Sequence, residues 1–303
     1  METRDLIIIG GGPAGYTAAL YAARAGLDTL VVERMSTGGQ MALTGDIENY
    51  PGFPEGIDGF TLGMNMQQTA ERFGAETRFG EVLSVKLSGE IKEIITDSGS
   101  LFAKTVIIAG GANPRELGLE REKAFLGRGV HYCAHCDGRF YKGKTVAVVG
   151  GGNSAAADAL YLSRLCEKVI LIHRRDTLRA TKIYHEPLLS AENVEFMWNS
   201  RVVDLQGDMR LSALTVEGDD QSLKTLPCDG LFVSIGRQPA TEFLGGALPL
   251  DPQGYIIADE TAKTPIEGVF VAGDIRTKEL RQVVTAVSDG AVAAHMAEKY
   301  LSI

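Results

Sequence analysis

The sequence predicts an α/β protein made of two three-layer domains, each with a mostly parallel sheet covered on both faces. Three observations predict this fold class. An apolar run, a glycine-rich turn and a helical pattern follow one another near the N-terminus, and the same series recurs from residue 145. The chain has 36 glycines, which suits many tight strand-to-helix turns. Its 303 residues are sufficient for two domains, each with its own core.

The first β-α-β unit occupies the N-terminus. The short apolar run at 6–9 predicts a buried parallel strand, followed by a helix at 14–25 and a strand at 29–33. The second unit repeats this order at 145–149, 154–165 and 168–173. The repeat indicates an internal duplication of one supersecondary unit rather than a solenoid.

Further elements surround these two units. A small antiparallel excursion is predicted at 80–97, and the chain closes with an amphipathic helix. The other expected helices and strands lie at 63–73, 101–109, 230–235, 269–274 and 283–300.

The second domain is predicted to be inserted into the first. We expect residues 1–114 and 245–303 to form a discontinuous domain, and residues 115–244 to form the insertion. Both junctions, at 114–118 and 238–245, contain glycine and proline, as domain linkers tend to. Two short crossings of this kind are typical of a hinge.

The first glycine turn, residues 10–15, has the spacing of a dinucleotide-binding turn. Gly10 permits the tight turn, Gly12 lets the backbone approach a pyrophosphate, and Gly15 lets the helix pack on the strand. Glu33 ends the next strand, where it can accept hydrogen bonds from ribose hydroxyls. Because strand, helix and acid are in register, we expect this turn, with Pro13 and Ala14, to bind a dinucleotide.

The second glycine turn, residues 150–155, differs where the acid would stand. Its positions Gly150, Gly152 and Ala155 match the first turn, and position 33 corresponds to His173. The residues that follow include Arg174, Arg175 and Arg179. Arginine binds a 2′-phosphate that a carboxylate would repel, so we expect NADPH here and FAD at the first turn. A solvated basic turn after a strand is the alternative.

These turns predict two Rossmann-like dinucleotide-binding domains, with the NADPH domain inserted into the FAD domain. The net charge of −9 argues against nucleic acid as a partner. We expect no signal peptide and no membrane segment, because no apolar run approaches the roughly 20 residues that a span requires.

Of four cysteines, only Cys133 and Cys136 are close in sequence. Without a predicted secretion signal, this spacing favours a redox-active pair over a structural disulfide. A zinc site needs about four ligands, and no second pair of cysteines or histidines completes one, so we expect no metal. Cys166 and Cys228 are expected to pack as small apolar residues.

Several motifs in the same order resemble the low-molecular-weight bacterial thioredoxin reductases, and the resemblance covers essentially the whole chain. The matching motifs are residues 38–40, 48–54, 133–138, 173–179, 272–274 and 281–282. The resemblance implies that Asp274 hydrogen-bonds the ribityl or phosphate region of FAD, with Gln282 and Val283 near the isoalloxazine. The other implied contacts are Gly39, Gln40, Asn49, Ala109, Gly273 and Arg281 to FAD, and Asn153, Ser154, Ile235 and Gly236 to NADPH. Members are typically cytoplasmic homodimers with one FAD per subunit.

The activity we expect is NADPH-dependent reduction of thioredoxin. NADPH would reduce FAD, FAD would reduce the Cys133–Cys136 disulfide, and the dithiol would reduce a partner protein. Asp137 is the candidate general acid, and a helix N-terminus with His131 or His135 nearby would favour the thiolate. The cysteines and the NADPH site share the inserted domain, so we expect them to reach the flavin alternately, by rotation about the linkers.

Two other enzyme functions stay open: reduction of another dithiol carrier, such as a peroxiredoxin or a glutaredoxin-like protein, and a flavin dithiol oxidase. His135 stands where the family often has Thr or Val, which leaves the partner open. Ala157 stands where the family usually has Glu, and Gly110 departs from the family's Ala-Thr-Gly turn. The arginines weigh against the oxidase, which has no use for NADPH. A dinucleotide sensor without turnover would need no dithiol.

Overall fold

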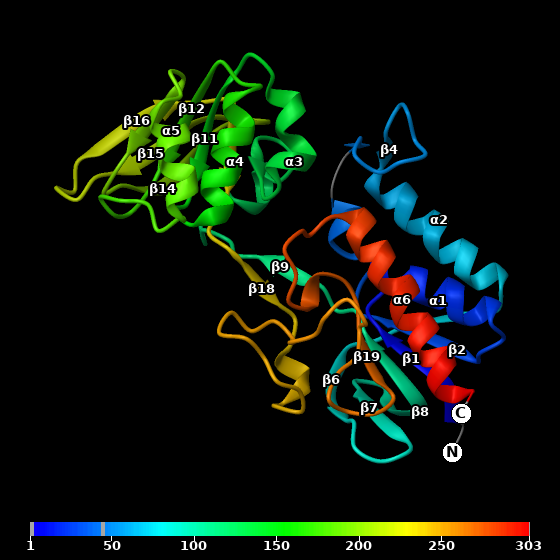
Figure 1. Ribbon diagram of the computed structural model, residues 1–303. Helices are drawn as coiled ribbons and strands as arrows, with labels where there is room; N and C mark the ends of the chain where they lie inside the picture. Colours follow the sequence, from blue (N-terminus) through cyan, green and yellow to red (C-terminus); the bar gives the residue numbers. More distant parts are fainter. Residues whose placement is uncertain (1–2, 44–45, 303) are drawn as a thin grey trace. The chain divides into compact units, whose positions relative to one another are not determined.

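The computed structural model describes residues 3–43 and 46–302, which divide into two compact units (Figure 1). Unit 1 comprises residues 1–113 and 238–303, and unit 2 comprises residues 114–237. The second crossing therefore lies earlier than the sequence suggested. The reason is that β18 (Arg237–Pro239), on which the chain leaves unit 2, pairs with β9 (Ala112–Pro114), on which it enters.

Unit 1 is organised around a seven-stranded sheet with the order β5-β2-β1-β8-β7-β6, and β19 pairs with β8. The parallel strands are β1 (Thr3–Ile9), β2 (Thr29–Glu33), β5 (Glu76–Phe79), β8 (Gly99–Ile108) and β19 (Val269–Val271). The predicted antiparallel excursion is the pair β6 (Val82–Lys86) and β7 (Lys92–Thr96).

Alternation along β1 explains the layers of unit 1. Leu6 and Ile8 belong to an apolar cluster with alanines of α1 (Pro13–Arg24) and α6 (Val283–Leu301). Ile7 and Ile9 point to the other face, where they cluster with β7 and with residues 244–256. A strand buried on both faces appears as a continuous apolar run, as the sequence indicated.

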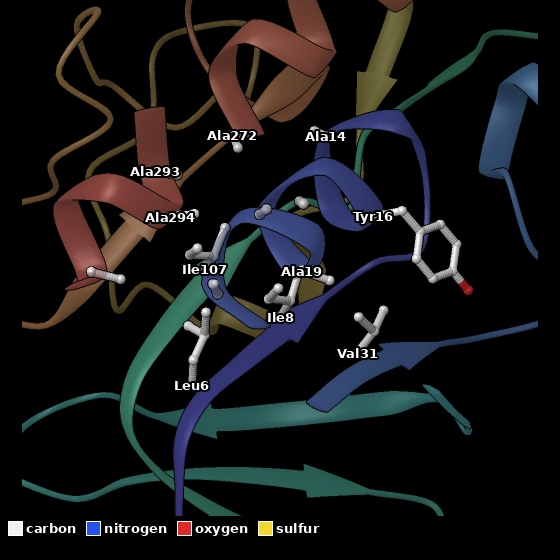
Figure 2. Close-up of a cluster of buried hydrophobic side chains, with 14 of the residues drawn as sticks. Leu6, Ile8, Ala14, Tyr16, Ala19, Val31, Ile107, Ala272, Ala293 and Ala294 are labelled. Carbon is white, nitrogen blue, oxygen red and sulfur yellow. The ribbon is translucent and has the colours of Figure 1, made fainter. Parts of the chain in front are cut away.

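Small residues bring α1 and α6 close together. Figure 2 shows Ala14 and Ala19 of α1, Ala293 and Ala294 of α6, and Leu6 and Ile8 of β1 gathered in one apolar cluster. A Cβ at Gly290 would overlap the carbonyl group of Ala14, so the two helices approach at backbone distance. This packing holds the start of α1 beside the ends of β1, β8 and β19.

Unit 2 contains a five-stranded parallel sheet with the order β10-β17-β11-β12-β13. Its strands are β10 (Val130–His131), β11 (Thr145–Val149), β12 (Lys168–Ile172), β13 (Val194–Met197) and β17 (Gly230–Val233). α4 (Asn153–Ser163) packs on one face through Ala155, Ala156 and Ala159. On the other face lies an antiparallel sheet of β14 (Arg201–Gly207), β15 (Leu211–Glu217) and β16 (Leu223–Pro227).

The 14-residue helix α2 (Gly59–Arg72) begins four residues before the predicted 63, because Asp58 caps it by accepting from the N–H of Thr61. The remaining elements are short. The other helices of unit 2 are α3 (Ala134–Asp137) and α5 (His185–Leu189), and the two-residue strands β3 (Asp46–Ile47) and β4 (Ile57–Asp58) pair in unit 1.

Candidate active site

Cys133 and Cys136 form a disulfide at the start of α3, with their Cα atoms 5.3 Å apart. Cys133 is the N-cap of this one-turn helix, and its Sγ accepts from the backbone N–H of Cys136 at 3.2 Å. Both residues are partly accessible to solvent. The structure thus joins the two predicted cysteines in a closed four-residue turn that a disulfide reagent can reach.

The side chain of Asp137, directly after Cys136, is turned toward His131. Its Oδ2 lies 3.0 Å from Nδ1 of His131, and Nε2 of His131 lies 2.7 Å from the hydroxyl of Tyr141. The imidazole is stacked on Phe232 and is 7% exposed. His131 therefore contacts the candidate acid rather than a sulfur, which refines the role that the sequence suggested.

His135, the second residue of the two-residue cysteine spacer, lies on a different face of the turn. Its ring stacks on Tyr161 of α4 with a centroid separation of 4.3 Å, and Nδ1 is 3.9 Å from Asp158 Oδ1. The hydroxyl of Ser234 donates to the other oxygen of Asp158 at 2.6 Å. Burial raises the pKa of Asp158. His135 itself remains half exposed.

The first glycine turn has the open approach that a pyrophosphate needs. A Cβ at Gly12 would meet nothing within 4 Å, whereas a Cβ at Gly15 would overlap the carbonyl of Gly10. Gly12 is the N-cap of α1, and the first turn of this helix carries neither a side-chain cap nor an acid. The free N–H groups of such a helix end are suited to an anion.

Glu33 lies against the first glycine turn. Its Oε2 accepts from the N–H of Gly11 at 2.7 Å and its Oε1 from the N–H of Met35 at 3.1 Å. In unit 2 the same relation holds between Gly151 and His173, since a Cβ at Gly151 would collide with the imidazole. The correspondence of positions 33 and 173, obtained by counting, is thus visible in the fold.

The expected flavin contacts outside the turn gather in unit 1. Gly39 lies next to Gly12, Gly10 lies against Ala109, and Gly273 lies against Ala14. The amide of Gln40 donates to Asn113 at 2.8 Å, and that of Asn49 donates to Gln282 at 3.0 Å. Val283 packs against the small cluster of Met41, Ile47 and Leu62. Asp274 follows Gly273 at the end of β19, within the same group of segments.

Arg281 lies in the loop between β19 and α6. Its guanidinium donates to the backbone carbonyls of Asp274, Arg276 and Lys278, and it lies 4.0 Å from the ring centroid of Tyr255. These bonds hold residues 274–281 in a closed loop. Arg281 thus shapes the loop between β19 and α6.

The second glycine turn also has an open N-cap, because a Cβ at Gly152 would meet nothing within 4 Å. The carbonyl of Gly151 accepts from the N–H groups of Arg179 and Ala180, and Asn153 accepts from the N–H of Thr181. These bonds hold the arginine loop, residues 174–179, beside the turn. Arg174, Arg175 and Arg179 are exposed.

The buried His173 directly precedes this arginine loop. Burial, with the three nearby arginines, lowers the pKa of His173, and its Nε2 has no hydrogen-bond partner among the described residues. Residues 234–236 follow β17 beside Gly150, whose Cβ would overlap the carbonyl of Ser234. The predicted residues Ser154, Ala155, Ile235 and Gly236 thus belong to segments around one turn.

Two buried acids that the sequence did not single out hold the loops of the site. In unit 1, Asp289 of α6 accepts from the N–H of Gly273 at 2.9 Å and pairs with Arg276 and Lys278. In unit 2, Glu122 accepts from the N–H groups of residues 117–119 and from the hydroxyl of Tyr132, next to Cys133. An acid inside an otherwise apolar helix was the signal available for Asp289. Glu122 lies in a charged segment, so the sequence carried no comparable signal for it.

The other two cysteines, Cys166 and Cys228, are buried free thiols. Burial raises the pKa of Cys166 to about 11 and that of Cys228 to about 12. In residues 3–43 and 46–302, no group of three or more His, Cys, Asp or Glu side chains is placed to hold a metal ion. None of the described helices has the length and apolar character needed to cross a bilayer.

Comparison with known proteins places this arrangement in a family. Residues 4–290 match the family model described as pyridine nucleotide-disulphide oxidoreductase. The chain is 46% identical to a thioredoxin reductase of Streptomyces coelicolor, over 99% of this chain and 95% of that protein. It is 45% identical to a thioredoxin reductase of Bacillus subtilis, over 98% of this chain and 94% of that protein.

A solved structure agrees with these relatives. The thioredoxin reductase of Streptococcus pyogenes superposes with a TM-score of 0.93 at 42% identity, covering 99% of this chain and 98% of that one. The family match spans both glycine turns and the disulfide between them. The chain therefore belongs to the pyridine nucleotide-disulphide oxidoreductases.

Proposed function

We propose that this protein is an NADPH-dependent thioredoxin reductase with FAD as its resident cofactor. The observation that carries the proposal is the Cys133–Cys136 disulfide in the same unit as the second glycine turn and its arginine loop. Relatives named thioredoxin reductase match the chain over nearly its whole length, which supports thioredoxin as the partner.

The residues of unit 1 fit FAD. The open N-cap at Gly12 and the free N–H groups of α1 would bind the pyrophosphate, and Glu33 at the end of β2 would face the adenosine ribose. The pairs Asn49–Gln282 and Gln40–Asn113 would present amide groups to the flavin ring. When bound, the flavin accepts two electrons from a hydride and passes them to a disulfide.

The residues of unit 2 fit NADPH. Gly152 and the start of α4 would bind the pyrophosphate, and the exposed arginines of the arginine loop would bind the 2′-phosphate. A carboxylate at position 173 would repel that phosphate, whereas the buried His173 holds the loop next to the turn. We therefore expect a preference for NADPH over NADH.

The cysteine turn supplies the terminal step. Opening the disulfide leaves a thiol and a thiolate, and Asp137 would protonate the thiolate because it directly follows Cys136. The dithiol then reduces the partner's disulfide by exchange. Since the cysteines and the arginine loop share unit 2, rotation about β9 and β18 would present them in turn to the flavin of unit 1. We further propose that the protein is cytoplasmic and forms a homodimer. Sedimentation equilibrium of the holoenzyme tests the homodimer.

Anaerobic mixing with NADPH, followed by flavin absorbance, tests the function. We expect bleaching with NADPH, much slower bleaching with NADH, and reoxidation when oxidised thioredoxin is added. Absence of bleaching would overturn the reductase assignment. Reoxidation by another dithiol carrier but not by thioredoxin would change the partner, and rapid reoxidation by oxygen with a free dithiol substrate would identify an oxidase.

A further inference from the structure

The surroundings of Asp137 contain a buried chain of three polar side chains. Oδ2 of Asp137 lies 3.0 Å from Nδ1 of His131, and Nε2 of His131 lies 2.7 Å from the hydroxyl of Tyr141. Asp137 is 14% exposed, and His131 and Tyr141 are buried. Both ring nitrogens of His131 are therefore engaged, one by a carboxylate and the other by a phenol.

Strand pairing and aromatic packing position the three side chains of this chain. His131 ends β10 opposite Phe232 of β17, which stacks on its ring with a centroid separation of 5.3 Å. Tyr141 stands edge-on to both rings. A Cβ at Gly230 would overlap the Tyr141 ring, so only glycine leaves room for it there. These contacts fix the orientation of the imidazole independently of Asp137.

Such a chain can hold one proton more or one proton fewer without losing a partner. With the proton, His131 is an imidazolium between the carboxylate and the phenol oxygen, or Asp137 is a carboxylic acid that donates to Nδ1. Without it, Nδ1–H faces the carboxylate, and the Tyr141 hydroxyl donates to Nε2. Burial raises the pKa of Tyr141 to about 12, so the phenol keeps its proton in both states.

We propose that Asp137 and His131 share the proton used in disulfide reduction, and that His131 is the positioning residue that holds this proton beside the cysteine turn. The inference deepens the proposed function and rests on it. Overall, NADPH and one proton convert the disulfide to a dithiol and release NADP⁺. The S–S bond breaks with the two electrons of the hydride, and the Asp137–His131 pair delivers the proton that the thiolate takes up. Solvent then reprotonates the pair.

The other titratable and charged groups that face this chain come from several segments. Lys144, just before β11, lies 5.4 Å from the Tyr141 ring centroid. From the neighbouring strands and loops, Asp229, Cys228 and Arg210 act on Tyr141. None of these replaces the carboxylate at Nδ1. The coupling we propose is therefore specific to Asp137 and His131, and a coupled pair titrates as a unit.

Histidine NMR of the oxidised holoenzyme tests the coupling directly, without turnover. The chain has five histidines, so the His131 signal is assigned by its loss in His131→Asn. In Asp137→Asn we expect the proton affinity of His131 to fall by at least about tenfold, one pH unit in midpoint. His131 titration unaltered by Asp137→Asn would overturn the proposal. Because the measurement needs no thioredoxin, its failure is separate from failure of the proposed function.

Kinetics give the second readout, with NADPH and the small disulfide 5,5′-dithiobis(2-nitrobenzoate) across pH. An Asn amide at position 131 can still face Asp137 but cannot carry the proton. We expect the alkaline decline in rate to move to lower pH by at least one unit in His131→Asn, with the low-pH rate within about twofold of wild type. Equal loss at every pH, or no shift, would contradict the shared proton.

Two further variants complete the design. His295→Asn removes an exposed histidine of α6 and should leave the pH profile unchanged. If His131→Asn does not fold, the His131 signal is assigned by elimination from Asn variants of the other four histidines. Tyr141→Phe then takes its place, since the ring is kept and only the hydroxyl at Nε2 is lost. We expect Tyr141→Phe to shift the His131 titration, and an unchanged midpoint would overturn the role of the buried chain.

Discussion

The backbone N–H of Cys136 donates to Sγ of Cys133 across 3.2 Å, so both cysteines belong to one hydrogen-bonded turn. This turn opens α3 and lies in unit 2, while the first glycine turn lies in unit 1. Removing a sulfur therefore alters a local turn and leaves the segments that would bind either dinucleotide in place.

Replacing Cys133 or Cys136 by serine should separate hydride uptake from dithiol chemistry. We expect Cys133→Ser and Cys136→Ser to be bleached by NADPH as fast as wild type, but to reduce thioredoxin no faster than buffer does. Stopped-flow flavin absorbance and a thioredoxin assay measure the two steps. Cys166→Ser is the control, because Cys166 is a buried free thiol and should not affect electron transfer. Retained turnover in either of the first two variants would refute the dithiol step.

The arginine loop should decide between the two nicotinamide dinucleotides. A hydrogen bond to a charged group contributes about 1.5–3 kcal/mol, so we expect Arg174→Gln, Arg175→Gln or Arg179→Gln to raise the KM for NADPH roughly 10- to 100-fold. The KM for NADH should be little changed. Arg164→Gln, at the exposed C-terminal end of α4, is the matched control. Equal effects on both dinucleotides would argue for a solvated basic turn.

Two glycines of the first glycine turn should respond in opposite ways to alanine. Gly12→Ala adds a Cβ that meets no protein atom within 4 Å, so we expect normal stability of the apoprotein and weak FAD binding. Gly15→Ala places its Cβ on the carbonyl of Gly10 and should cost about 1–3 kcal/mol or more of unfolding free energy. Urea unfolding and FAD fluorescence titration measure these quantities. Normal FAD affinity in Gly12→Ala would contradict the pyrophosphate site.

Asp289 should stabilise unit 1 in a pH-dependent way. Its pKa is lowered: burial alone would raise it, but hydrogen bonds and charges from Arg276 and Lys278 outweigh burial. The contribution is therefore fully present above the ordinary Asp value of 3.8 and is lost as pH falls below it. We expect Asp289→Asn to lose about 3–5 kcal/mol at pH 7, because buried Lys278 loses its carboxylate and buried Arg276 keeps only the exposed Glu260.

Thermal or urea unfolding of Asp289→Asn and wild type between pH 3 and pH 7 measures this difference. The gap between the two proteins should narrow toward pH 3. Asp208→Asn provides a control, since that residue is exposed in the turn between β14 and β15 of unit 2. A constant gap across the range would show that the charge of Asp289 is not the source of the stability.

Cys166 and Cys228 should resist alkylation in the folded protein. Their raised pKa values keep both thiols protonated at pH 8, and both side chains are buried. After reduction of the disulfide, we expect iodoacetamide to label Cys133 and Cys136 alone, and all four residues in urea. Peptide mass spectrometry counts the labels. Fast labelling of Cys228 in the native protein would show that the connection between β16 and β17 opens readily.

Most of the parallel sheet could be predicted because its strands are buried on both faces. Such strands are continuous apolar runs, as in β1 and β11, and a glycine turn marks where each ends. The antiparallel strands β14 and β15 were missed because irregularities in their pairing, between Val202 and Asp204 and between Gln206 and Gly207, break the apolar–polar alternation. β5 and β13 are edge strands with few fully buried residues, which leaves a weak pattern.

The residues of the site also fall into those that the sequence predicts and those that it does not. Chemistry held in one short segment, such as Cys133 with Cys136 or the order of Gly10, Gly12 and Gly15, follows from spacing alone. The contact of Asn49 with Gln282 joins residues 233 positions apart, and no local pattern announces it. Asp289 was missed because a carboxylate in an apolar helix acquires meaning only when its partners are known.

The sequence by itself determined the duplicated β-α-β unit, the two glycine turns, the exchange of Glu33 for His173 and the neighbouring cysteines. These depend on residue type and spacing, which the chain carries directly. Only the tertiary structure decided that His131 bonds Asp137 and Tyr141, that His135 stacks on Tyr161, and that Arg281 closes a loop. Those contacts depend on where β10, α4 and β19 bring side chains together, because packing, not sequence order, sets the neighbours of a folded residue.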